Sequence, residues 1–171
     1  MKIIKELTTG ILLIGMAGAA NANLISNGGF EDINGTHSGN AFDTLSAPNN
    51  SIEGWSVTSG SIDWINTHWQ ASEGTKSIDL AGNQVGQILG TQFATRIGTV
   101  YDVSFDVAGN PDNASSGTTK YGVSSTVNGS GTHNTNLFSF DTVGATRANM
   151  GWTTMSYSFT ASDFVTSLQF Q

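Results

Sequence analysis

Residues 99–108, with the sequence TVYDVSFDVA, alternate between apolar and polar side chains along almost their whole length. The apolar positions are Tyr101, Val103, Phe105 and Val107, and the polar positions between them are Asp102, Ser104 and Asp106. Successive side chains of a β-strand point to opposite faces of the sheet, so this pattern predicts a strand with one buried and one solvated face. Such a strand belongs to a sheet that covers a core on one side.

The same period of two recurs along the rest of the chain. Alternation marks 155–159 and 168–170, and shorter strand candidates lie at 52–57, 62–65, 77–80, 87–89, 120–127 and 137–140. Charged residues make up only 11% of the chain and there are 21 glycines, a composition that favours short strands and tight turns over helices. We therefore predict an all-β sandwich of about eight or nine strands.

The first 22 residues have the pattern of a secretory signal peptide. Lys2 and Lys5 precede an apolar run at 11–17, and Ala20-Asn21-Ala22 has the form of a signal-peptidase site. The run is too short for a membrane span, which takes roughly 20 apolar residues. We interpret residues 1–22 as the signal peptide of an exported chain and 23–171 as a single β-sandwich domain. Because alternation continues through 168–170 to the final residue, we expect this domain to lack its last strand at the C-terminus.

Charge and cysteine content exclude several classes of partner and site. Without residues 1–22 the chain has four basic and twelve acidic residues, and the basic ones are scattered. Binding to nucleic acid depends on a basic patch, so nucleic acid is excluded as a partner, and no later segment is apolar enough for a transmembrane span. The absence of cysteine rules out disulfides, thiolate metal sites and a cysteine nucleophile.

Several blocks together resemble one family of bacterial surface proteins. They are NLISNGGFED at 23–32, SIEGWSVTSGSIDWINTHWQASEGTKSIDLAG at 51–82, TVYDVSFDVAGNPD at 99–112 and MGWTTMSYSFTA at 150–161. The order and spacing of these blocks resemble the choice-of-anchor C family, which is related to a domain of unknown function in plant cell-wall proteins. The resemblance extends over 23–171.

This resemblance implies a galactose-binding-like jelly roll of two antiparallel sheets. It also implies secretion and anchoring at the cell surface through C-terminal sorting signals, which this sequence does not include. No activity is firmly attached to the family. For its plant relatives, binding to cell-wall polysaccharide or to wall-modifying enzymes is the usual suggestion.

A structural calcium ion is a candidate cofactor. Calcium prefers carboxylate and carbonyl oxygens, and Glu31 and Asp32 follow the glycine-rich bend at 27–30. Carbohydrate-binding jelly rolls that this chain resembles use a glutamate placed like Glu31 together with an acidic residue of the last strand. The alternative is that Glu31 and Asp32 only end a strand in solvent. The turn at 110–113 also offers oxygens, although Asx side chains that bond their own backbone explain it more simply.

No catalytic constellation is recognisable. A glycosidase needs two carboxyl groups across one cleft, and the outward-facing Asp63 and Asp79 belong to separate strand patterns. His37, His68 and His133 lie in separate segments, without a serine-elbow motif or the close spacing of a zinc site. We expect a protein that is not an enzyme.

The aromatic residues suggest a carbohydrate site in one segment. The patterns place Trp55, Trp64 and Trp152 in the core, whereas Trp69 follows a strand end and precedes a polar loop. There an indole can stack on a sugar ring, with His68, Asn66 and Gln70 beside it, although packing in the core is an equal alternative for Trp69.

Two functions follow from these observations. The first is an exported, non-catalytic module of the cell surface or extracellular matrix that binds polysaccharide or another envelope glycan. The second is a structural or adhesive surface domain that binds surface proteins or copies of itself.

Overall fold

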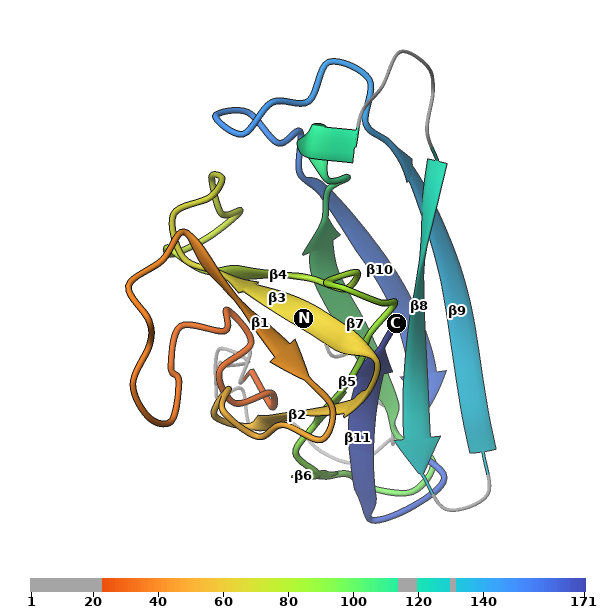
Figure 1. Ribbon diagram of the computed structural model, residues 1–171. Helices are drawn as coiled ribbons and strands as arrows, with labels where there is room; N and C mark the ends of the chain where they lie inside the picture. The colour runs from red at the N-terminus through yellow and green to blue at the C-terminus, as the bar shows by residue number, and fades with distance from the viewer. Residues whose placement is uncertain (1–22, 114–119, 130–131) are drawn as a thin grey trace, which may run out of the picture.

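The computed structural model describes residues 23–113, 120–129 and 132–171, and within these ranges its regular secondary structure is almost entirely β-strand (Figure 1). The predicted signal peptide lies outside the described residues. The strands are β1 (Phe42–Ser46), β2 (Trp55–Ser59), β3 (Ser61–Ile65), β4 (Ser77–Asp79), β5 (Gln87–Gly90), β6 (Phe93–Ala94), β7 (Val100–Val107), β8 (Lys120–Gly129), β9 (Thr132–Asp141), β10 (Thr153–Thr160) and β11 (Val165–Phe170). A 3-10 turn, η1, spans Pro111–Asn113.

The strands form two layers of antiparallel sheet. One layer is a six-stranded sheet with the order β2-β5-β11-β8-β9, in which β6 also pairs with β11. The other layer consists of two separate pieces, the three-stranded sheet β1-β3-β4 and the pair β10-β7. The all-β sandwich predicted from the sequence is therefore confirmed.

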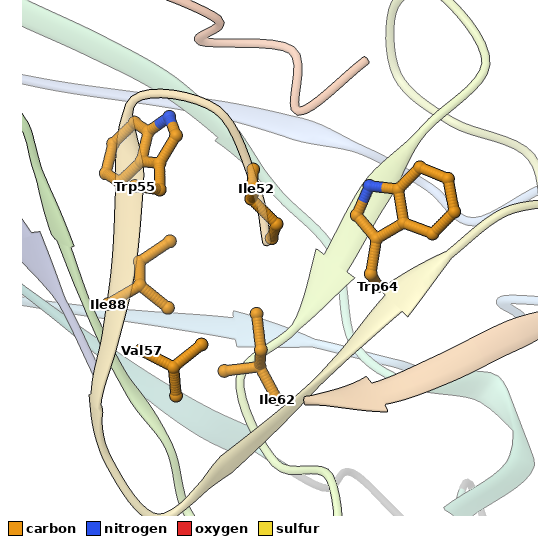
Figure 2. Packing of buried hydrophobic residues seen from close by; sticks show 6 residues of the cluster. All are labelled: Ile52, Trp55, Val57, Ile62, Trp64 and Ile88. Atoms are coloured by element: carbon orange, nitrogen blue, oxygen red, sulfur yellow. The ribbon is translucent and has the colours of Figure 1, made fainter. Parts of the chain in front are cut away.

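Each piece of the second layer covers a different part of the six-stranded sheet. Ile62 and Trp64 of β3 belong to one buried cluster with Trp55, Val57 and Ile88 of β2 and β5 and with Ile52, and Figure 2 shows these six residues. A second cluster joins β7 and β10 to β8 and β11, and its buried members are Val103, Val127, Phe159, Ala161 and Leu168. One cluster thus lies under each piece of the second layer, and a third, smaller cluster contains Ile65, Trp69 and Met150.

Consecutive strands repeatedly cross from one layer to the other, as in a jelly roll. β2 lies in the six-stranded sheet and β3 in the second layer, with only Gly60 between them. Gly60 has a φ of +60°, and a Cβ added there would lie 1.9 Å from the carbonyl oxygen of Val85. This corner accepts only glycine, because any side chain would collide with backbone that cannot swing away.

Two buried indoles tie the N-terminal segment to the core. Trp55 is 5% exposed and donates its Nε1–H to the carbonyl of Asn27 at 3.0 Å. Trp64 is 1% exposed and donates to the carbonyl of Phe30 at 2.8 Å. A buried indole N–H needs an acceptor, so these bonds fix the 27–30 bend on the core.

The strand pattern at 99–108 agrees with the observed burial. In β7, Val103 and Val107 are buried and Tyr101 and Phe105 are half-buried, whereas the residues between them are exposed. All the predicted strands occur, with shifted ends, but β1 and β6 were not predicted. Among the described residues, no helix combines the length and apolar character needed to cross a membrane.

Candidate functional site

The segment 66–70, which follows β3, brings a histidine to the centre of a polar surface. The Nε2 atom of His68 lies 2.7 Å from Oδ2 of Asp112, in the turn η1. Arg147 donates two hydrogen bonds to the same carboxylate, from Nε at 2.8 Å and from Nη2 at 2.9 Å. The His68 ring also meets the ring of Phe42 edge-on, with 5.1 Å between centroids. We call these four residues the His68–Arg147 surface.

Charge pairing holds this surface in one arrangement. The hydrogen bonds from Arg147, and then that from His68, lower the pKa of Asp112 below its ordinary value. The bond to Asp112 correspondingly raises the pKa of the Arg147 guanidinium. Exposure of the side chains rises from 16% for His68 to 36% for Asp112 and 56% for Arg147. The surface therefore presents a planar cation and a carboxylate to solvent beside the partly exposed ring of Phe42.

Trp69 does not form an exposed platform. It is only 8% exposed, packs with Ile65 and Met150, and donates its indole N–H to Oγ of Ser77 at 2.9 Å. The expectation that its ring lies partly in solvent is wrong, and the packing alternative is correct. Trp69 is buried because it packs on Ile65, at the C-terminal end of β3. Ile65 is apolar, and the contact with Trp69 removes its side chain from water.

The other two predicted sugar ligands, Asn66 and Gln70, are engaged mainly with the protein itself. Oδ1 of Asn66 accepts a hydrogen bond from Lys76 Nζ at 2.6 Å, and its Nδ2 donates to the carbonyl of Asn40 at 3.0 Å. Gln70 uses its backbone, accepting from the indole of Trp152 at 2.9 Å. The side chain of Gln70 is exposed, so it remains accessible from the solvent.

Glu31 faces hydrogen-bond donors. Its Oε1 accepts from the backbone N–H of Thr75 at 2.8 Å and of Lys76 at 2.9 Å, and its Oε2 accepts from Oγ1 of Thr75 at 2.7 Å. Burial acts to raise the pKa of Glu31, but these bonds outweigh it and the pKa lies below its ordinary value. The carboxylate acts as an anchor for the loop at 72–76.

The expected calcium site stays a prediction, because all the observed bonds of Glu31 are to groups of the protein. The oxygens of Glu31 point at N–H and O–H groups, and calcium requires several converging oxygen ligands. Asp32 is exposed, and its backbone N–H bonds to Oδ1 of Asn27 at 3.0 Å. In the ranges that the structure describes, no three His, Asp or Glu side chains are grouped so as to hold a metal ion.

Asp63 and Asp79 lie directly opposite each other across β3 and β4, so they share a sheet face. Oδ1 of Asp63 accepts from Oγ1 of Thr44 at 2.6 Å, and Oδ2 of Asp79 accepts from Nδ2 of Asn110 at 2.8 Å. Burial, and in smaller part the charge of Asp63, raises the pKa of Asp79 above its ordinary value. Asp79 is therefore not the fully solvated carboxylate that its strand pattern predicts.

His37 and His68 do not lie in one site. His37 bonds to Asp43, and His68 bonds to Asp112, so each has a separate acidic partner. His133 belongs to β9, and its side chain lies outside the described atoms.

Sequence reasoning missed Asp112 and Arg147 as partners of His68. It correctly identified the Asx turn around Asp112, whose backbone N–H donates to Oδ1 of Asn110 at 2.9 Å. The available signal was weak: Arg147 is one of only four basic residues after residue 22. A cation in so acidic a chain has many possible carboxylate partners, and the sequence does not show that Asp112 is the one that Arg147 contacts.

A model of the family described as "Protein of unknown function (DUF642)" matches residues 23–171, the whole of the predicted domain. The chain belongs to the DUF642 family. This confirms the relation to the domain of unknown function to which the sequence blocks pointed.

Two further likenesses to this DUF642 chain concern parts of larger proteins. Halomucin of Haloquadratum walsbyi is 35% identical over 104 residues, which is 60% of this chain but only 1% of halomucin. The N-terminal CBM22-1-CBM22-2 tandem domain of Paenibacillus barcinonensis Xyn10C is similar in structure, with a TM-score of 0.40 and 15% identity. That alignment covers 80% of this chain and 42% of the tandem domain.

Proposed function

We propose that this DUF642 chain is an exported, non-catalytic module of the cell surface or extracellular matrix that binds carbohydrate. Export follows from the signal-peptide pattern at 1–22. Anchoring outside the cell, as in the choice-of-anchor C proteins that the sequence blocks resemble, is part of the proposal.

The observation that carries the carbohydrate part is the His68–Arg147 surface. Sugars are recognised by planar groups that donate to or accept from neighbouring hydroxyls, next to an aromatic ring that covers the apolar face of the sugar. Arg147 supplies exposed donors, Asp112 supplies acceptors, and Phe42 is 38% exposed beside them. The proposed sugar-binding site therefore consists of Phe42, Asp112 and Arg147 around His68, and it does not include Trp69.

The test is retention on insoluble polysaccharides such as cellulose, xylan and chitin. Phe42→Ala and Arg147→Gln each remove one kind of contact and should reduce retention by about tenfold, the effect of losing roughly 1.4 kcal/mol. Trp69→Ala is unsuitable because it removes a buried residue and would destabilise the fold.

Matched controls exist for both variants. Leu137 is 80% exposed and lies on β9, and Arg96 is an exposed cation in another loop. Leu137→Ala and Arg96→Gln should therefore leave retention unchanged. Retention of all four variants at the wild-type level, or loss of retention in the controls as well, would refute the assignment of this surface.

A second function, that of an adhesive domain which binds protein partners, is favoured by one specific observation. An apolar cleft separates the two pieces of the second layer.

A further inference from the structure

Several asparagines of this chain begin the triplet Asn-X-Ser/Thr, in which X is any residue except proline. They are Asn34, Asn49, Asn113 and Asn128. In exported proteins this triplet is the acceptor for an N-linked glycan, and the linkage requires the asparagine side chain at the surface. The setting of each asparagine in the fold therefore decides which of them can be modified.

Asn34 lies in an open loop. Residues 34–36 have the sequence NGT, and all three are exposed. They belong to the loop that leads into β1 at the side of the molecule (Figure 1). A Cβ added at Gly35 would meet no atom within 4 Å, so the space around the middle of the triplet is free. The amide of Asn34 and the hydroxyl of Thr36 can therefore be approached from solvent.

Both ends of this loop are held by the fold. Before the triplet, the backbone N–H of Asn34 donates to the carbonyl of Ser51 at 2.5 Å. After it, His37 and Ser38 both bond to the carboxylate of Asp43. The anchors keep residues 34–36 on the surface of the folded chain, so an enzyme can reach them without a prior opening of the structure.

The other triplets are in less suitable places. Asn49 is half-buried, and its Oδ1 accepts from the backbone N–H of Ser51, the third residue of its own triplet, at 2.9 Å. Asn128 is half-buried within β8, which pairs with β9 on one side and β11 on the other. Asn113 ends η1, and its triplet continues into residues outside the described ranges. Accessibility thus favours Asn34 over Asn49 and Asn128.

A charged neighbour separates Asn34 from Asn113 as well. The bacterial oligosaccharyltransferases that form this linkage favour an acidic residue two positions before the asparagine. Asp32 has that position before Asn34, and it is exposed. The corresponding residues before the other three asparagines are Ala47, Pro111 and Thr126. Exposure and the acidic neighbour therefore coincide at Asn34 alone among these triplets.

We propose that Asn34 is the acceptor of an N-linked oligosaccharide transferred from a lipid-diphosphate donor. In the transfer, Nδ2 of Asn34 attacks the anomeric carbon of the donor sugar. A carbon–nitrogen bond forms, and the bond between that carbon and the phosphate oxygen breaks. The lipid diphosphate leaves with the electron pair, and one Nδ2 proton passes to a base of the enzyme. The proposal rests on the export proposed above, because the donor and the enzyme act on exported chains.

The test combines the purified, folded chain with a bacterial oligosaccharyltransferase and a lipid-linked oligosaccharide. The intact mass should rise by one glycan, and peptide mapping should place that glycan on Asn34. The synthetic peptide EDINGTHSG, which corresponds to residues 31–39, serves as an unstructured acceptor. The folded chain should react at a rate within about tenfold of the peptide, because residues 34–36 need no opening. This reaction does not require export and does not involve the His68–Arg147 surface, so its outcome is independent of both.

Matched substitutions test each part of the acceptor. Asn34→Gln and Thr36→Ala should abolish the modification, whereas Thr36→Ser should retain it because the hydroxyl is kept. Asp32→Asn should slow the modification of both the chain and the peptide. Asn49→Gln removes an asparagine from another triplet and should leave the rate unchanged.

Three results would overturn the proposal. The first is a chain that stays unmodified, whether or not the peptide reacts. The second is a glycan on Asn49, Asn113 or Asn128 in place of Asn34. The third is modification of Thr36→Ala at the wild-type rate, which would show that the triplet is not what the enzyme recognises.

Discussion

The carboxylate of Glu31 should contribute measurably to stability, and Glu31→Gln isolates that contribution. The substitution keeps the size of the side chain but removes the charge that accepts three hydrogen bonds from Thr75 and Lys76. Hydrogen bonds to a charged group contribute about 1.5–3 kcal/mol each when buried. Glu31 is exposed, so solvent screening reduces the sum to about 1 kcal/mol in total.

The pH dependence has a defined sign. The pKa of Glu31 in the folded state lies below its ordinary value of 4.5, so the contribution is fully present above pH 4.5. It is lost as the pH falls through the folded-state pKa, where wild type and Glu31→Gln should converge. Urea denaturation of both proteins between pH 7 and pH 3 measures the difference.

A control variant and a second measurement distinguish the effect of the Glu31 hydrogen bonds from a general effect of charge. Asp32→Asn removes a neighbouring exposed charge and should change stability by less than about 0.5 kcal/mol at any pH in this range. Amide exchange at Thr75 and Lys76 should accelerate in Glu31→Gln, because these N–H groups donate to the carboxylate. Equal effects of the two variants, or a difference that does not vary with pH, would refute this account of Glu31.

Gly60→Ala should destabilise the chain by about 3 kcal/mol or more, because it adds a steric clash with Val85 to an unfavourable φ. Gly144 also has a positive φ but has open space around it, so Gly144→Ala should destabilise the chain by only about 1–2 kcal/mol. Phe105→Ala should cost about 2–3 kcal/mol, less than a fully buried phenylalanine, whereas Asp106→Asn should cost less than about 1 kcal/mol. Urea titration checks all four, and equal effects within either pair would contradict the geometry. Addition of calcium or of a chelator should leave Tm unchanged in calorimetry, and a calcium-dependent rise would restore the metal site that the geometry does not favour.

Local pattern predicted the strands well because burial on one face imposes a period of two. β7 is the clearest case: its alternation appears in the sequence and again in its burial. β1 escaped prediction because FDTLS, at 42–46, follows a polar loop and has only two large apolar residues. The pairing of strands depends on contacts between segments that are distant in the sequence. The local alternation of side chains locates each strand but does not show which strand is its neighbour.

The candidate site was predicted less well for the same reason. Whether Trp69 is buried depends on Met150, and the setting of His68 depends on Asp112 and Arg147. All three partners are more than 40 residues away along the chain. Glu31 was predicted as a calcium ligand from its carboxylate beside a glycine-rich bend and from a resemblance, whereas its partners, Thr75 and Lys76, became visible only in the folded chain.

The position of β11 has a consequence for the order of folding. β11, at residues 165–170, comes after β1 to β10 in chain order, yet it pairs with β5, β6 and β8 in the interior of its sheet. The large sheet therefore cannot close until these residues have been synthesised, and contacts of such long range make folding slow. For the export proposed above this delay is favourable, because the large sheet lacks its central strand, and the chain can still thread through a translocation channel, until residues 165–170 have been made.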